Sequence, residues 1–195
     1  VNTISIQSDI IKNMVSCLNK CDLSLAGIAI APYLSGLSSL LEDEMELGVV
    51  CIDLGAASSS LSIFFRKNLI FSRSIRIGGQ HITNDIMQAF QISFLAAERL
   101  KVLHGGLLPT NSDDRETLEL PESNTDLFTD RRTITKSELL GVIRPRVEEI
   151  FDSLRSILDQ SDFEFLPGQK IVLTGGGSKL ENILRYQILL LPPLQ

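Results

Sequence analysis

The sequence has 195 residues, 44% of them hydrophobic and 22% charged, a balance that indicates a folded globular protein rather than a disordered one. A formal net charge of −6 disfavours binding to nucleic acid, because no basic face is available for phosphates; the cluster Arg131, Arg132 and Lys136 is too short to change that. The first residues lack the pattern of a signal peptide, and no run approaches the ~20 apolar residues of a membrane span.

The first 46 residues predict a helix, a short strand and a second helix, with no sheet of their own. Apolar residues recur at helical spacing over residues 8–20, and residues 25–32 predict a strand that ends at a proline. Residues 33–41 predict a helix that runs into an acidic stretch, interpreted as a solvated face. The region therefore looks incomplete, and because the chain does not begin with Met we expect it to be part of a longer protein.

The three cysteines, Cys17, Cys21 and Cys51, are an odd number and lie inside apolar stretches. This pattern predicts reduced thiols in the core of a cytosolic protein. Cys17 and Cys21 lie one helical turn apart, but the further ligands that zinc needs are missing around them. We therefore expect no metal site at these thiols.

Residues 48–77 carry the clearest strand pattern. An apolar run closes at Gly55, a β-rich run follows, and an alternating run ends at two glycines. The tight connection at residues 66–68 predicts a hairpin, so the region predicts a three-stranded antiparallel meander. A strand at 169–174 is expected to join the same mixed sheet, with helices from 79–103 and 135–162 packed on it.

A polar stretch and a long helical pattern separate the meander from that last strand. Residues 105–130 are rich in turn formers, with a single strand at most, at 116–120. The helix that follows opens with a capping box, Thr135 with Glu138, and continues as an apolar stripe. Pro145 is expected to kink or divide it.

The stretch QKIVLTGGGS ends the last strand with three consecutive glycines. A glycine costs backbone entropy and packs no side chain, so a triplet needs a local reason. The reason is either a sharp turn or a backbone that lies against a flat or phosphorylated ligand. A helix capped by Ser178 and Glu181 is expected to follow.

Four motifs occur in order along the chain: DLGAASS from Asp53, GGQHITNDI from Gly78, AERLK from Ala97 and TGGGS from Thr174. Each alone is a weak signal, but in this order, with compatible strands between them, they resemble the second half of an actin/Hsp70-type ATPase domain. The resemblance is closest to the FtsA family of bacterial cell-division proteins and covers residues 8–185. It implies an α/β, actin-like (ribonuclease H-like) ATPase fold, in which a mixed sheet with an antiparallel meander carries flanking helices and a small inserted subdomain.

The same resemblance implies a division of the chain. Residues 1–46 would be the end of the first actin-like subdomain, incomplete here. Residues 47–94 and 166–195 would form the second large subdomain (2A), and residues 95–165 the small inserted subdomain (2B).

A nucleotide site is the main functional implication of the resemblance, with ATP and Mg²⁺ as cofactors. The hairpin after Asp53 would meet the phosphates with its main chain, and Asp53 would hold Mg²⁺ through water. Glu98 and Lys101 would reach the ribose and adenine, and the adenine would lie on the bare backbone of the glycine triplet. The expected nucleotide-binding residues are Asp53, Gly55, Ser58, Ser59, Gly78, Gly79, Glu98, Lys101, Gly175, Gly176, Gly177 and Ser178. Taken without the resemblance, Glu98 and Lys101 are a solvated ion pair, and the glycines are structural turns.

Departures from the family pattern count against full activity. Relatives carry glycine, two threonines and an aspartate where this chain has Ala57, Ser58, Ser59 and Ser60. The family's other phosphate loop and its small domain for later division proteins would precede this chain. Its amphipathic membrane helix, through which alone membrane contact is expected, would follow the chain. We therefore expect weak or undetectable ATP binding and at most a weak ATPase, and assign no catalytic residue.

In function, the resemblance implies a cytoplasmic scaffold at the inner face of the membrane at the division site. It would link filaments of the division tubulin FtsZ to the division machinery, associate with other division proteins and assemble with itself into actin-like filaments. The FtsZ C-terminal tail would dock on subdomain 2B beside a set of cations. These are Arg131, Arg132, Lys136, Arg144 and Arg146. Two alternatives stay open: an actin-like pilus-assembly ATPase of the PilM type, or a nucleotide-free interaction module.

Overall fold

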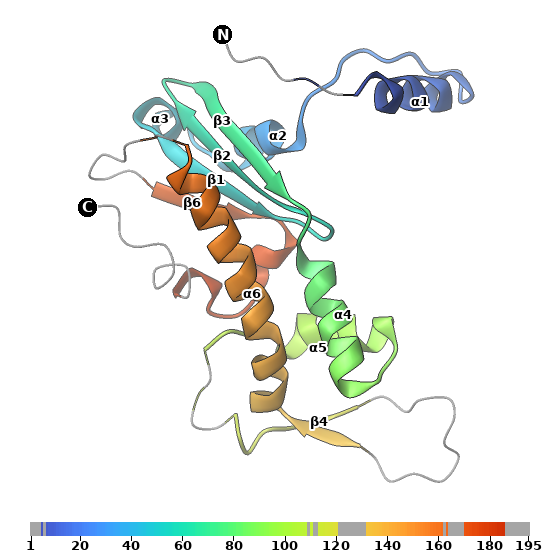
Figure 1. The fold of residues 1–195 in the computed structure, drawn as a ribbon, viewed down its shortest axis with the longest axis vertical. Coiled ribbons are helices and arrows are strands. Elements are labelled where there is room, and N and C mark those ends of the chain that lie inside the picture. The colour runs from blue at the N-terminus through green and yellow to red at the C-terminus, as the bar shows by residue number, and fades with distance from the viewer. Residues whose placement is uncertain are drawn as a thin grey trace.

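The computed structural model describes residues 5, 7–108, 110, 113–120, 132–161, 163 and 170–185. The elements in chain order are α1 (Ser8–Asn19), α2 (Ala31–Ser39), α3 (Glu42–Leu47), β1 (Val49–Leu54), β2 (Ser59–Phe65), β3 (Asn68–Ile75), α4 (Gly79–Phe90), α5 (Phe94–His104), β4 (Thr117–Glu119), β5 (Thr133–Thr135), α6 (Lys136–Asp159), β6 (Lys170–Thr174) and the 3₁₀ turn η1 (Gly176–Lys179). Figure 1 shows a central sheet crossed by α6, with α4, α5 and the β4–β5 pair at one end.

A four-stranded mixed sheet, in the order β3-β2-β1-β6, forms the centre of the fold. β1, β2 and β3 are antiparallel neighbours, and β6 pairs with β1 in parallel, so both sheet predictions are confirmed. The register places Asp53 of β1 opposite Thr174 of β6. The two strands therefore end side by side, and the turns that follow them meet at one edge of the sheet.

The hairpin between β2 and β3 turns on Arg66 and Lys67, both in the left-handed region with φ of 50° and 61°. Such a two-residue turn matches the right-handed twist of the strands. The N–H groups of the two residues donate to the carbonyls of Glu46 and Met45. The acidic stretch thus forms α3, in which Glu42, Asp43 and Glu46 are exposed. The last turn of this helix binds the hairpin.

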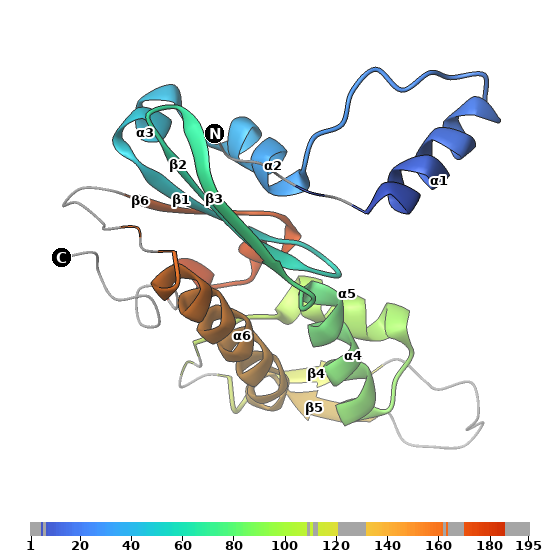
Figure 2. The same ribbon diagram turned by 45° about the horizontal axis from the view of Figure 1, so that its top comes forward.

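Both faces of β1 are buried, because helices cover the sheet on two sides (Figure 2). Val49 and Cys51 pack in a cluster with Leu40, which follows α2, and with Met45 of α3 and Phe64 of β2. Val50 and Ile52, which alternate with them, belong to the main core with the apolar stripe of α6. This is the reason for the continuous apolar run at the start of the meander.

Helix α6 is a single element, so Pro145 lies inside it and does not divide it. The predicted capping box is confirmed: Thr135 Oγ1 accepts from the Glu138 N–H at 3.1 Å, and the Glu138 carboxylate accepts from the Thr135 N–H at 2.7 Å. The helix packs on β2 and β3 at one end and on α4 and β5 at the other. One apolar core therefore runs from the sheet into the inserted region, where the proposed subdomain boundaries stay a prediction.

Two predictions for the N-terminal region are wrong. Residues 25–30 belong to no strand, because they have no neighbouring strand with which to form a ladder. Cys17 and Cys21 are exposed, since α1 has no buried residue and stands apart from the sheet (Figures 1 and 2). Cys51 is buried as expected, and burial raises the pKa of its thiol to about 11.

The inserted region holds a second, two-stranded sheet. β4 confirms the strand expected at 116–120, and it pairs antiparallel with β5, which the sequence reading missed. Within the described part of the chain, no helix combines the length and the apolar character needed to cross a membrane.

Candidate functional site

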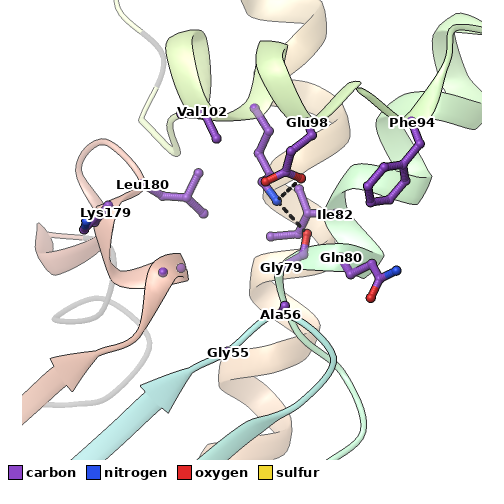
Figure 3. A pocket seen from close by; sticks show the side chains of 13 residues that line it. Gly55, Ala56, Gly79, Gln80, Ile82, Phe94, Glu98, Val102, Lys179 and Leu180 are labelled. Atoms are coloured by element: carbon purple, nitrogen blue, oxygen red, sulfur yellow. Dashed lines mark hydrogen bonds and ion pairs between the residues drawn. The ribbon is translucent and has the colours of Figure 1, made fainter. Parts of the chain in front are cut away.

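A pocket of about 580 Å³ opens where the ends of β1 and β6 meet α4 and α5 (Figure 3). A volume of this size suits a small-molecule ligand. The residues that line it are Gly55, Ala56, Gly79, Gln80, Ile82, Phe94, Glu98, Lys101, Val102, Gly176, Gly177, Lys179 and Leu180. All four sequence motifs therefore contribute residues to one pocket.

One side of the pocket is formed by backbone and very small residues; Gly55, Ala56, Gly176 and Gly177 are called here the main-chain wall. A Cβ on Gly176 would meet nothing within 4 Å, so this glycine leaves open space at the pocket. A Cβ on Gly177 would lie 2.8 Å from Leu54 Cβ. Gly177 is therefore required by packing against β1 as well.

Gly175 has a separate structural reason to be glycine and does not line the pocket. Its φ is +83°, and a Cβ there would lie 2.6 Å from the Leu54 carbonyl oxygen. The glycine triplet thus has two structural reasons. Gly175 permits a left-handed turn packed tightly against β1, and Gly176 leaves a bare backbone surface at the pocket.

The start of α4 is docked on the turn between β1 and β2. The Gly79 and Gln80 N–H groups donate to the carbonyls of Gly55 and Ala56 at 2.9 and 2.8 Å. A Cβ on Gly78 would lie 2.6 Å from the Gly55 carbonyl oxygen, so only glycine permits this approach.

The other side of the pocket is formed by side chains of α5; Phe94, Glu98, Lys101 and Val102 are called here the side-chain wall. Lys101 Nζ donates to the Gly79 carbonyl at 2.9 Å and to Glu98 Oε2 at 2.7 Å. Burial alone would raise the pKa of Glu98, but hydrogen bonds from Lys101 and Thr83 outweigh it and hold the pKa below its ordinary value. The pocket therefore contains an ionised carboxylate fixed in place.

Ser58, Ser59 and Ser178 were expected at the site but do not line the pocket. Ser58 is exposed in the turn, and Ser59 is buried, where its hydroxyl donates to the Ile77 carbonyl at 2.8 Å. Ser178 lies inside the 3₁₀ turn and not before a helix, and its hydroxyl donates back to the Gly175 carbonyl at 2.7 Å.

Asp53 also lies outside the pocket lining, at the end of β1. It is half-buried, and its Oδ2 accepts a hydrogen bond from the Ser35 hydroxyl at 2.6 Å. Among the described residues, no three His, Cys, Asp or Glu side chains gather as a metal site. A single carboxylate suits Mg²⁺ only where water and phosphate oxygens supply the remaining ligands, as expected for Asp53.

Two of the cations proposed for partner binding already contact acceptors within this chain. Arg132 Nη2 donates to the Phe90 carbonyl at 3.0 Å. Lys136 Nζ lies 3.6 to 3.8 Å from three carboxylates. They belong to Asp113, Glu116 and Glu181. Arg131 lies outside the described residues.

The remaining two cations lie on α6. Arg146 binds both carboxylate oxygens of Asp85 on α4, at 2.7 and 3.0 Å, and also pairs with Glu149. Arg144 pairs with Glu148 one turn along the helix, at 3.0 Å. Arg146 therefore joins two helices, whereas the pair of Arg144 with Glu148 stays within one.

The sequence reading missed several residues around the pocket. Phe94 and Val102 lie four residues on either side of Glu98, so helical spacing could have identified them. Thr83 lies within the quoted GGQHITNDI motif, but nothing in the sequence shows that its hydroxyl meets α5.

Comparison with solved structures defines the class of protein. MreB5 of Spiroplasma citri bound to ADP superposes with a TM-score of 0.74 at 20% identity, over 96% of this chain and 58% of that one. PilM in a PilM–PilN type IV pilus biogenesis complex gives a TM-score of 0.66 at 20% identity, over 94% of this chain and 46% of that one. The chain therefore has the actin-like fold that the motifs predicted.

Comparison of sequences identifies the family within this fold. The family model for Cell division protein FtsA matches residues 50–187, and the chain belongs to this family, as the motifs indicated. FtsA of Rhizobium meliloti is 32% identical over 183 residues, 94% of this chain and 41% of that protein. FtsA of Bacillus subtilis is 30% identical over 175 residues, 90% of this chain and 39% of that protein. The chain thus spans about two fifths of the length of these curated relatives.

Proposed function

We propose that the chain is an ATP-binding part of an actin-like scaffold in bacterial cell division, and that adenine nucleotide occupies the pocket described above. The observation that carries the proposal is the meeting of four sequence motifs around one pocket, between a bare main-chain wall and a fixed, ionised carboxylate. MreB5, which shares the fold, has been solved with ADP and with AMPPNP. The pilus alternative rests on the fold alone, because PilM is 20% identical.

Each wall suits a different part of the nucleotide. The open surface at Gly176 accepts a flat base, and Glu98 accepts hydrogen bonds from ribose hydroxyls. The turn at Gly55 and Ala56 lies where the phosphates would approach main chain. When bound beside Asp53, Mg²⁺ would neutralise phosphate charge.

A nucleotide titration followed by amide NMR tests this proposal with one substitution and a matched control. Gly176→Val places a branched side chain in the open space of the pocket and should abolish the shifts that ATP causes in wild type. Gly27→Val is the control, because a Cβ there also meets nothing within 4 Å and Gly27 does not line the pocket. Titration to millimolar ATP detects weak binding. Absence of shifts at the pocket glycines in wild type would contradict the proposal.

We further propose that the FtsZ tail docks on the inserted region, in a scaffold at the cytoplasmic face of the membrane that also self-associates. A hollow of about 420 Å³ lies between α5 and β4. Leu100, Leu103 and Leu118 line it, together with Arg99, His104 and Glu119. The leucines suit the apolar residues of an acidic and apolar peptide, and Arg99 suits its acidic ones.

Fluorescence anisotropy of a labelled FtsZ tail peptide tests the docking, with an expected Kd of about 10 µM, or about −7 kcal/mol. Binding should weaken at high salt, because salt screens the ionic part. Arg99→Glu reverses the charge of an arginine that lines the hollow, and Arg144→Glu tests the cation on α6, outside that lining, that the sequence proposed. Arg146 is not, because it joins α6 to α4. Binding that ignores salt and both substitutions would contradict a cationic groove.

A further inference from the structure

Thr83 contacts both charged side chains of the side-chain wall. Its side chain is fully buried on α4, opposite α5. Its Oγ1 lies 2.5 Å from Glu98 Oε2, 2.7 Å from Lys101 Nζ and 3.1 Å from the Gly79 carbonyl oxygen. One hydroxyl therefore contacts both ionic groups of the wall.

The directions of these hydrogen bonds follow from the donors available. Lys101 has three N–H donors, and their acceptors are the Gly79 carbonyl, Thr83 Oγ1 and Glu98 Oε2. Thr83 therefore accepts from Lys101 and has one proton to donate. The two acceptors within reach are the Gly79 carbonyl oxygen at 3.1 Å and Glu98 Oε2, which is nearer and charged, so the proton is assigned to the carboxylate.

This arrangement assigns different tasks to the two oxygens of Glu98. Both bonds, from Thr83 and from Lys101, end on Oε2. Oε1 is used by neither, and the side chain is 40% exposed at the pocket. The three donors of Lys101 are already committed, so Glu98 Oε1 is the polar atom of this pair that can serve a ligand.

We propose that Thr83 is a positioning residue for the nucleotide site: it fixes the Glu98 carboxylate so that Oε1 faces a ligand hydroxyl, and it acts through Glu98 without touching the ligand. The proposal rests on the nucleotide site proposed above. The other charged groups that line the pocket around Glu98 are Lys101 on the same helix and Lys179 on η1.

The first test reads the state of Glu98 without any ligand. Carboxyl ¹³C NMR follows the titration of Glu98 in wild type, Thr83→Val and Thr83→Ser. The hydrogen bond stabilises the ionised form, so its loss in Thr83→Val should move the midpoint to higher pH. Thr83→Ser keeps the hydroxyl and should keep the wild-type midpoint. An unchanged midpoint in Thr83→Val would overturn the proposal.

The second test asks whether Thr83 acts through Glu98. ATP titrations should show about tenfold weaker binding for Thr83→Val, the loss of one charge-assisted hydrogen bond, and near wild-type binding for Thr83→Ser. In a Glu98→Gln background, Thr83→Val should add little, because the two changes remove the same interaction. An equal loss in both backgrounds would overturn the proposal. Absence of ATP binding by wild type would instead overturn the nucleotide site, and the carboxyl titration would still decide whether Thr83 controls Glu98.

Discussion

The two walls of the pocket are built by different means. The main-chain wall consists of glycines and one alanine at strand ends, where a parallel pair of strands fixes the backbone. The side-chain wall is carried by α5, whose polar groups are fixed by hydrogen bonds to α4. Steric requirements therefore control the first wall, and ionisable groups control the second.

This difference determines how each wall can fail. A side chain at Gly177 in the main-chain wall, or at Gly175 beside it, would press against Leu54 and disturb the sheet, whereas one at Gly176 would only enter the pocket. A substitution in the side-chain wall removes a hydrogen bond, which weakens the site and changes its response to pH.

The largest effect is expected for Gly175→Ala. The alanine would adopt φ of +83° with its Cβ 2.6 Å from the Leu54 carbonyl oxygen. Strain and overpacking together should lower the free energy of unfolding by about 3 kcal/mol. Gly176→Ala is the matched control, with a change below about 0.5 kcal/mol, because its Cβ meets open space. Urea unfolding measures both, and equal stabilities would show that the turn can relax.

A smaller loss of stability is expected when the contact between α6 and α4 is weakened. Helix α4 supports the side-chain wall. Arg146→Met removes a bidentate pair with Asp85 and should cost about 2 kcal/mol. Arg144→Met is the control on the same helix. Its i,i+4 pair with Glu148 is exposed, so the cost should stay below about 0.5 kcal/mol. Similar unfolding midpoints for the two variants would mean that the Arg146 pair does not fasten α4.

The smallest effect concerns pH. The pKa of Glu98 is lower in the folded chain than its ordinary value of 4.5, so its contribution to stability is complete above that pH. As the pH falls below 4.5 towards the lower folded-state pKa, the contribution is lost. The stability gap between wild type and Glu98→Gln, below about 1 kcal/mol for a partly exposed pair, should therefore close over that interval. A gap that widens in acid would reverse the assigned direction of the shift.

The sequence was sufficient for the parts of the fold that depend on local pattern. Apolar and alternating runs predicted the strands of the meander, and the structure shows that the first of them is buried on both faces. The capping box at Thr135 predicted the start of α6. Each of these signals lies within a few residues of the structure that it specifies.

Features that depend on distant neighbours could not be predicted in this way. Residues 25–30 have the composition of a strand, but a strand also needs a partner. The apolar stripe of α1 predicted burial for Cys17, although α1 packs no residue in the core. β5 is three residues long, too short to show a period of two.

The candidate site shows the same limit. The glycine motifs identified both strand-end turns of the pocket, because backbone requirements are visible as glycines. They could not show that Gly175 and Gly177 must be glycine because a Cβ at either position would collide with Leu54. The motifs also could not show that Lys101 donates hydrogen bonds to Thr83, Glu98 and a main-chain carbonyl. Those contacts depend on the packing of α4 beside α5.

The parallel pairing of β6 with β1 has a consequence for the order of folding. The meander is assembled from neighbouring hairpins, which form in about 1–10 µs. β6 reaches β1 only after the whole inserted region has been made, and closing so long a loop is slow. During synthesis the meander therefore leaves the ribosome before its parallel neighbour exists, with one edge of β1 uncovered. Gly176 directly follows β6 in the chain, so the pocket can form only after β6 has paired with β1. A ligand could therefore bind only to a chain whose sheet is complete.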